Sequence, residues 1–188
     1  NNYINTNPKP IYNINTNTAI KRLRMLTTIF DTEKIQEVRR LLDKAQRVVI
    51  LTHMSPDGDA MGSSLGLYHF LKKTKEVHVV VPNKFPDFFN WMPEVEQVCV
   101  YEQSQEQADM WLEEADLVIC SDFNEPKRIG SLGDKLLAVK AETQCPIILI
   151  DHHLYPSDIA DVTLSEPKSP SASELVYRLL RQLGEIDL

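Results

Sequence analysis

The stretch that decides the fold is the apolar run Val48–Thr52 together with the sequence that follows it, His53-Met54-Ser55-Pro56-Asp57-Gly58-Asp59-Ala60. Two later apolar runs end in a similar way: Leu117–Ser121 is followed by Asp122, and Pro146–Ile150 is followed by Asp151-His152-His153. Short β-rich runs of this kind are typical of buried parallel strands. In an open α/β sheet, ligands bind where such strands end. The three acidic strand ends therefore predict one shared site.

The chemistry of these strand ends predicts a divalent-metal site that holds two ions. Asp57 and Asp59 are separated by one glycine, so both side chains project to the same side of an extended stretch. His53 lies four residues before Asp57, where it can complete a chelate. Imidazole and carboxylate without thiolate favour Mn²⁺, Fe²⁺, Co²⁺ or Mg²⁺ over a structural zinc ion. Without cations, the convergence of so many carboxylates and imidazoles would be electrostatically unfavourable.

Each motif also has a simpler interpretation when it is taken alone. Asp57-Gly58 is a common turn signal, Asp122 could cap a helix, and His152-His153 could be a surface pair. The joint occurrence at three strand ends favours metal binding over these alternatives.

Small residues after the first motif, among them Gly62 and Ser63, predict a phosphate-binding helix start. A helix that begins here would aim its N-terminal N–H groups at the metal site, which suits an anionic oxygen. Metal ligands beside an anion-binding helix end indicate phosphoryl transfer to water. Two ions about 4 Å apart can share a hydroxide nucleophile and neutralise the charge that develops on the phosphoryl group.

The alternation of strands and helices predicts an α/β fold with a doubly wound, mainly parallel sheet flanked by helices. Ser171-Ala172-Ser173-Glu174 is a capping box that opens the last helix. The polar, proline-bearing segment Leu154–Pro170 is expected to be a loop. The other expected strands are Val77–Val81 and Val98–Val100, and the expected helices are Thr32–Ala45, Met61–Lys73, a helix around Trp111–Ala115, Gly130–Ala141 and Ala172–Leu183.

Composition and charge limit the class of protein. With 188 residues, 43% hydrophobic and 25% charged, the chain has room for one globular domain, and no apolar stretch approaches the length of a membrane span. A net charge of −7 argues against a purely electrostatic nucleic-acid binder, although bound cations would still admit a phosphorylated substrate. The dispersed Cys99, Cys120 and Cys145 argue against a disulfide framework and favour a cytoplasmic location. Residues 1–24, rich in Asn and Thr, are expected to be a disordered extension or upstream sequence, which leaves 25–188 as the domain.

The motifs resemble those of the DHH phosphoesterase family, whose name is the triplet that stands here as Asp151-His152-His153. The resemblance covers about residues 32–183 and is strongest in the first motif, from His53 to Ser63. It implies two Mn²⁺ ions, with Mg²⁺ or Co²⁺ as alternatives, and a ligand set in which His53 and Asp57 hold one ion, Asp59 and His152 hold the other, and Asp122 bridges them. It further implies that His153 faces the scissile phosphate and that Asp151 orients the neighbouring imidazoles. Arg128 would contact the substrate phosphate or would be an ordinary surface arginine.

Within the family, the chain looks most similar to the bacterial subgroup of oligoribonucleases and 3′-phosphoadenosine-5′-phosphate phosphatases. The family's fourth motif, which supplies another Asp to the second ion, and its C-terminal substrate domain are absent from this chain. The expectation is therefore an N-terminal domain truncated at its C-terminal end, weak or inactive by itself, rather than a degenerate member of the family.

The function expected from the resemblance is a metal-dependent phosphohydrolase. It would cleave phosphoester bonds of short RNA or DNA oligonucleotides, or remove the 3′-phosphate of nucleoside bisphosphates, by a two-metal hydroxide mechanism. Alternatives are a manganese-dependent pyrophosphatase, a cyclic-dinucleotide phosphodiesterase and, from another class, a non-catalytic nucleotide-binding or sensor module. No membrane partner is expected, and a homodimer is compatible with the sequence.

Overall fold

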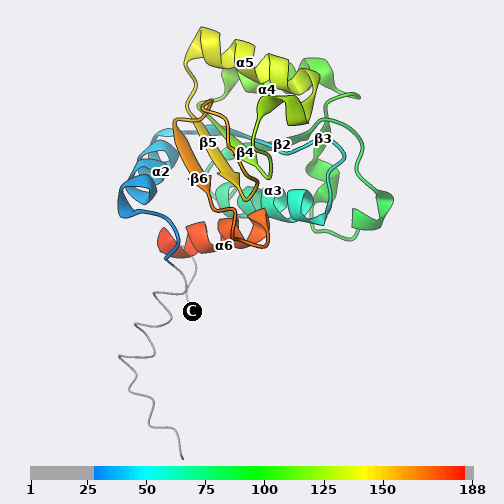
Figure 1. The fold of residues 1–188 in the computed structure, drawn as a ribbon. Helices are drawn as coiled ribbons and strands as arrows, with labels where there is room; N and C mark the ends of the chain where they lie inside the picture. The colour runs from blue at the N-terminus through cyan, green and yellow to red at the C-terminus, as the bar shows by residue number, and fades with distance from the viewer. Residues whose placement is uncertain (1–27, 185–188) are drawn as a thin grey trace, which may run out of the picture.

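The computed structural model describes residues 28–184, which form one parallel six-stranded sheet with helices on both faces (Figure 1). The strands are β1 Arg47–Leu51, β2 Glu76–Val81, β3 Cys99–Val100, β4 Leu117–Ser121, β5 Ile147–Asp151 and β6 Val162–Ser165. The α-helices are α2 Thr32–Lys44, α3 Gly58–Leu71, α4 Gln105–Glu114, α5 Ser131–Thr143 and α6 Ala172–Gln182, and short 3₁₀ turns are η1 Asp87–Phe89, η2 Val95–Gln97 and η3 Pro126–Ile129. The predicted α/β, doubly wound fold is confirmed.

The strands are apolar on both faces because helices cover both faces. Helices α2, α3 and α6 lie on one face of the sheet, and α4 and α5 lie on the other (Figure 1). Along β1, Val48 and Ile50 join the core under α2, α3 and α6, while Val49 and Leu51 join the core under α4 and α5. Burial on both sides explains the continuous apolar runs in the sequence.

The strand order places the predicted site at the point where the winding of the sheet reverses. The order is β3-β2-β1-β4-β5-β6, so the chain leaves β1 toward one edge and returns to build the other half from β4. Leu51 pairs with Cys120, and Ser121 pairs with Ile150. The residues after β1, β4 and β5 therefore meet at one edge, at the kind of crevice where open α/β sheets bind ligands.

Two predicted boundaries were wrong. The segment Leu154–Pro170, expected as loop, contains β6, a four-residue strand with alternating burial at the sheet edge. Such a short edge strand in a polar segment has little periodic signal. Helix α3 begins at Gly58 rather than near Met61, because the Asp57 carboxylate accepts the backbone N–H groups of Asp59 (2.9 Å) and Ala60 (3.0 Å) and caps the helix early.

Further expectations concern the cap of the last helix, the cysteines, membrane spans and the N-terminal extension. The capping serine is confirmed, since Ser171 Oγ accepts the N–H of Glu174 at 3.0 Å, although the Glu174 side chain pairs with Arg178 instead of returning to the cap. Cys99, Cys120 and Cys145 form no disulfide, as expected, and Cys120 is fully buried. No helix within residues 28–184 is both long and apolar enough to cross a membrane. The predicted extension 1–24 lies outside the described residues.

Candidate metal centre

Asp122 lies at the middle of the candidate centre, directly after β4. Its side chain is only 2% exposed, and its backbone adopts a left-handed conformation with φ of 65°. Aspartate tolerates this conformation better than most residues. The backbone N–H of Asp122 donates to Ile150 at 3.0 Å, which ties the end of β4 to β5. The turn therefore holds a buried carboxylate at the edge where the three motifs meet.

One group of potential ligands lies at Oδ2 of Asp122. His53 Nε2 is 3.5 Å from this oxygen and 3.8 Å from Asp57 Oδ1. The Nδ1 atom of His53 lies 2.8 Å from the carbonyl oxygen of Met54, which can only accept, so Nδ1 carries the hydrogen and Nε2 faces the carboxylates. One atom from each of His53, Asp57 and Asp122 lies within 4.8 Å of the others, close enough to hold a cation.

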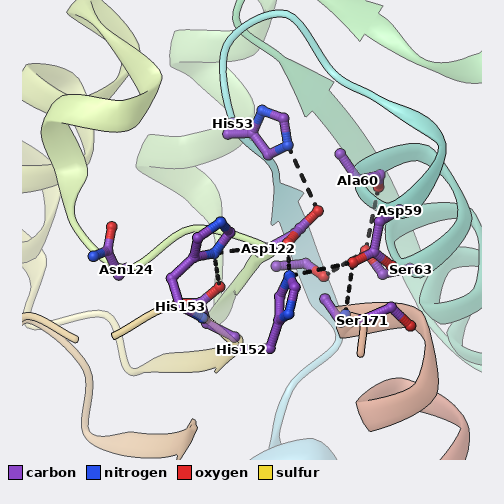
Figure 2. A network of polar contacts seen from close by, with 12 residues as sticks. His53, Asp59, Ala60, Ser63, Asp122, Asn124, His152, His153 and Ser171 are labelled. Carbon is purple, nitrogen blue, oxygen red and sulfur yellow. Dashed lines mark hydrogen bonds and ion pairs between the residues drawn. The ribbon is translucent and has the colours of Figure 1, made fainter. Parts of the chain in front are cut away.

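A second group lies at Oδ1 of the same carboxylate. His152 Nε2 is 3.4 Å from Asp122 Oδ1 and 3.6 Å from Asp59 Oδ2. Figure 2 shows His53 and His152 approaching Asp122 from different sides, above and below it in this view, with Asp59 to the right of both Asp122 and His152. His153 also approaches this oxygen, with Nδ1 at 3.9 Å. The two oxygens of Asp122 thus face two separate sets of nitrogen and oxygen donors.

These residues fit two divalent cations that share one carboxylate. Asp122 Oδ1 is buried and has no hydrogen-bond partner among the described residues, which is costly for a carboxylate oxygen unless a cation meets it. The donors are imidazole nitrogens and carboxylate oxygens, a set that suits Mn²⁺, Co²⁺ or Mg²⁺.

The electrostatics of the metal-free centre agree with this fit. Burial raises the pKa of Asp122 above its ordinary 3.8, a hydrogen bond with His53 opposes the rise, and the nearby Asp59 adds to it. The hydrogen bond to Asp122 raises the pKa of His53 above 6.5 against the effect of burial. In the absence of metal, Asp122 and His53 therefore hold protons more tightly than they would in water, and a bound cation would relieve the same crowding.

Asp151 contacts one imidazole of the triplet rather than both. Its Oδ1 lies 2.7 Å from His153 Nδ1, and its Oδ2 accepts the backbone N–H of His153 at 3.1 Å. The Nδ1 atom of His152 instead lies 3.2 Å from the carbonyl oxygen of Ser169. Sequence reasoning missed Ser169, since a backbone carbonyl leaves no signature in a sequence.

The three residues predicted to bind phosphate lie in different surroundings. Ser63 is fully buried, and its hydroxyl accepts from Ser121 Oγ at 2.9 Å, beneath the centre. Gly62 faces α6, where an added Cβ would lie 3.0 Å from Ser173 Oγ. These contacts explain by packing why both residues are small, and their contact with phosphate stays a prediction. Arg128 is exposed on η3, and its carbonyl oxygen accepts the N–H of Met54 at 2.9 Å, beside His53.

Comparison with known proteins identifies the family. The sequence profile of the DHH family, N-terminal domain, matches residues 47–187. The chain belongs to the DHH family. Among curated DHH relatives, it is 30% identical over 154 residues to the bifunctional oligoribonuclease and PAP phosphatase NrnA of Thermus thermophilus, covering 81% of this chain and 42% of the relative. It is 26% identical over 191 residues to the cyclic-di-AMP phosphodiesterase PdeA of Listeria monocytogenes, covering 94% of this chain and 28% of the relative.

A solved structure has a similar fold. The DHH chain described here is similar to an exopolyphosphatase-related protein from Bacteroides fragilis, with 45% identity and a TM-score of 0.80. The match covers 84% of this chain and 46% of that one. The chain thus spans less than half the length of each of these relatives.

Proposed function

We propose that this DHH-family chain carries the metal centre of a phosphohydrolase that acts on short oligonucleotides or on the 3′-phosphate of nucleoside bisphosphates. The observation that carries the proposal is the position of Asp122, whose two carboxylate oxygens face separate donor groups, His53 with Asp57 and His152 with Asp59. The similarity to an oligoribonuclease and PAP phosphatase supports the choice of substrate.

In this proposal the chain holds two Mn²⁺ ions. His53, Asp57 and Asp122, whose donor atoms lie within 4.8 Å of one another, would hold one. Asp59, His152 and Asp122 would hold the other, since His152 Nε2 lies 3.6 Å from Asp59 and 3.4 Å from Asp122. The ions, when bound, would activate an attacking water and supply positive charge to the phosphoryl oxygens. The imidazoles are oriented for this task, because the Nδ1 atoms of His53 and His152 face carbonyl oxygens and their Nε2 atoms face the carboxylates.

His153 is the residue that we propose contacts the scissile phosphate. The Nδ1–H group of His153 donates to Asp151. The side chain of Asp151 is 0% exposed, whereas that of His153 is 37% exposed. Nε2 remains as the polar atom that, when the ring carries a second proton, can donate a hydrogen bond to a phosphoryl or leaving-group oxygen. Arg128, exposed beside the His53 loop, would supply a second contact to phosphate.

A cyclic-dinucleotide phosphodiesterase is the second candidate, favoured by the match of PdeA to 94% of this chain. The same metal centre could catalyse either reaction, because in both of them water attacks the phosphorus atom of a phosphate ester. A cytoplasmic location and a homodimer remain predictions; the location rests on the three unpaired cysteines.

A product analysis tests the proposal. The protein that carries this chain is incubated with Mn²⁺ and a diribonucleotide, an adenosine 3′,5′-bisphosphate, a cyclic dinucleotide or pyrophosphate, and the products are separated by chromatography. We expect turnover of the first two and its loss in Asp122→Asn. Turnover of pyrophosphate alone would overturn the proposal. Calorimetric binding of nucleotide without product after long incubation would instead indicate a sensor.

A further inference from the structure

The carboxylate of Asp59 is held by the first turn of α6, more than a hundred residues further along the chain. Its Oδ2 accepts the backbone N–H of Ala172 at 2.7 Å, and its Oδ1 accepts that of Ser173 at 2.8 Å. The hydroxyl of Ser173 also donates to the backbone carbonyl of Asp59 at 3.2 Å. Because both oxygens are tied to one rigid turn, the plane of this carboxylate is fixed by the position of α6.

The loop that leads into α6 orients the other ligand in the same half of the centre. The carbonyl oxygen of Ser169 accepts from His152 Nδ1 at 3.2 Å, which directs Nε2 toward Asp59 and Asp122. The Ser169 hydroxyl in turn donates to the carbonyl of Ser171, the capping residue of α6, at 3.1 Å. Residues 169–173 therefore position both Asp59 and His152.

The other half of the centre is held by different elements. His53 is oriented by the carbonyl of Met54, and Asp57 by the N–H groups of Asp59 and Ala60 at the start of its own helix. None of these contacts comes from α6. The two halves meet at Asp122 and at the hydrogen bond from Asp59 N–H to Asp57, so the position of α6 acts on one half directly and on the other only through these two links.

We propose that the segment 169–173, at the N-terminus of α6, positions Asp59 and His152 and thereby affects the affinity of one ion of the pair more strongly than that of the other. The proposal rests on the two-ion centre proposed above. The close approach of α6 depends on the glycine at 62, where a Cβ would lie 3.0 Å from Ser173 Oγ. At its other end, Gln182 accepts the N–H groups of Ile29 and Phe30, so α6 connects the first described residues to the metal centre.

The variant Ala172→Pro removes one of the two N–H donors to Asp59 and leaves the helix able to form. Proline suits the first position of a helix, and Ser171 before it is already extended, with φ of −161° and ψ of 155°. Loss of one hydrogen bond to a charged group predicts that Mn²⁺ binds the Asp59–His152 half at least about tenfold more weakly. The affinity of the His53–Asp57 half should change less, because only the shared Asp122 and the Asp57–Asp59 hydrogen bond couple it to the changed segment.

Arg178→Ala is the matched control. It removes the ion pair with Glu174 further along α6 and leaves residues 169–173 and every donor to Asp59 unchanged. Both affinities should then remain at the wild-type values. If proline disturbs folding at the buried residue 172, an ester made with lactic acid in place of Ala172 removes the same N–H without added bulk.

Mn²⁺ titration followed by calorimetry and by electron paramagnetic resonance gives the stoichiometry and both affinities without an activity assay. Weakening mainly of one ion in Ala172→Pro or in the ester, but not in Arg178→Ala, supports the proposal. Two ions bound with unchanged affinities would overturn the role of α6 and leave the proposed function standing. Fewer than two ions in the wild-type protein would overturn the two-ion centre, and the role of α6 with it.

Discussion

Asp151 accepts two hydrogen bonds from the same residue, His153: one from the ring Nδ1 at 2.7 Å and one from the backbone N–H at 3.1 Å. Since Asp151 is fully buried, this pair of contacts fixes both the ring orientation and the tautomer of His153. The proposed contact between His153 and phosphate therefore depends on a carboxylate that need not touch the substrate.

Asp151→Asn should lower kcat by about 10- to 100-fold while both metal affinities are retained, because the amide presents only one accepting oxygen to two donors. Steady-state kinetics and Mn²⁺ titration measure the two effects. Asp116→Asn is the matched control, since Asp116 also accepts two backbone N–H groups, from Gln46 (3.1 Å) and Arg47 (2.9 Å), at the opposite end of the strands. Equal losses of activity in both variants would contradict the role of Asp151.

Asp122→Asn should abolish the stabilisation of the protein by Mn²⁺. Asparagine tolerates the left-handed backbone of residue 122, so the fold should be kept. At an ion concentration about 100 times Kd, one bound ion stabilises the folded state by about 2.7 kcal/mol, and most of this should disappear with the shared carboxylate. Melting curves with and without Mn²⁺ measure the difference. A rise in melting temperature equal to that of wild type would show that the ions bind elsewhere.

Metal-free stability should fall as pH rises. The pKa of Asp122 is raised above 3.8 and that of His53 above 6.5, so the folded state binds these protons more tightly than the unfolded state. Each contribution is complete below the unfolded value and is lost as pH passes through the folded value, first for Asp122 and then, above 6.5, for His53.

Mn²⁺ should reverse this trend, because it displaces the same protons and binds more tightly as pH rises. Urea unfolding between pH 5 and about 8.5, with and without Mn²⁺, measures both trends. Stabilisation by Mn²⁺ that is independent of pH would show that Asp122 and His53 are not ligands.

Gly133→Ala should destabilise the fold by about 1–3 kcal/mol, because the added Cβ would overlap the carbonyl oxygen of Pro126 in η3. Gly66→Ala is the control in a helix without such a neighbour. Its Cβ would lie 3.9 Å from Val176, an ordinary contact, and alanine should stabilise the helix by up to about 1 kcal/mol. Urea unfolding distinguishes the two. If Gly133→Ala leaves the free energy of unfolding unchanged, η3 can move away from α5 at little cost.

Arg128→Ala should raise KM about tenfold or more and leave kcat within a few-fold of wild type, as expected for the loss of a charge-assisted hydrogen bond to substrate phosphate. Lys127→Ala removes a neighbouring exposed cation that pairs with Glu125 at 2.8 Å and should change neither constant. If the two variants behave alike, Arg128 is an ordinary surface arginine.

The sequence predicted the sheet and the composition of the site because both depend on local patterns. Apolar runs of strand length, alternating with helical segments, were enough to predict a parallel sheet, and the rule that ligands bind at strand ends was enough to predict that His53 and Asp122 would approach each other. The sequence failed at β6, where four residues of Val162–Ser165 form a strand by pairing with β5. The periodicity of so short a segment is weak, and its pairing partner decides its structure.

The sequence by itself determined which residue types reach the edge of the sheet. The apolar runs mark the parallel strands, and each motif directly follows the carboxyl end of one strand. Only the tertiary structure decided how those groups are oriented. Asp59 accepts hydrogen bonds from the backbone N–H groups of Ala172 and Ser173, and His152 Nδ1 donates one to the backbone carbonyl of Ser169. These partners are backbone atoms brought from far along the chain by the packing of α6 on α3. Backbone donors and acceptors are the same in every residue except proline, so no residue type marks them, and only folding selects them.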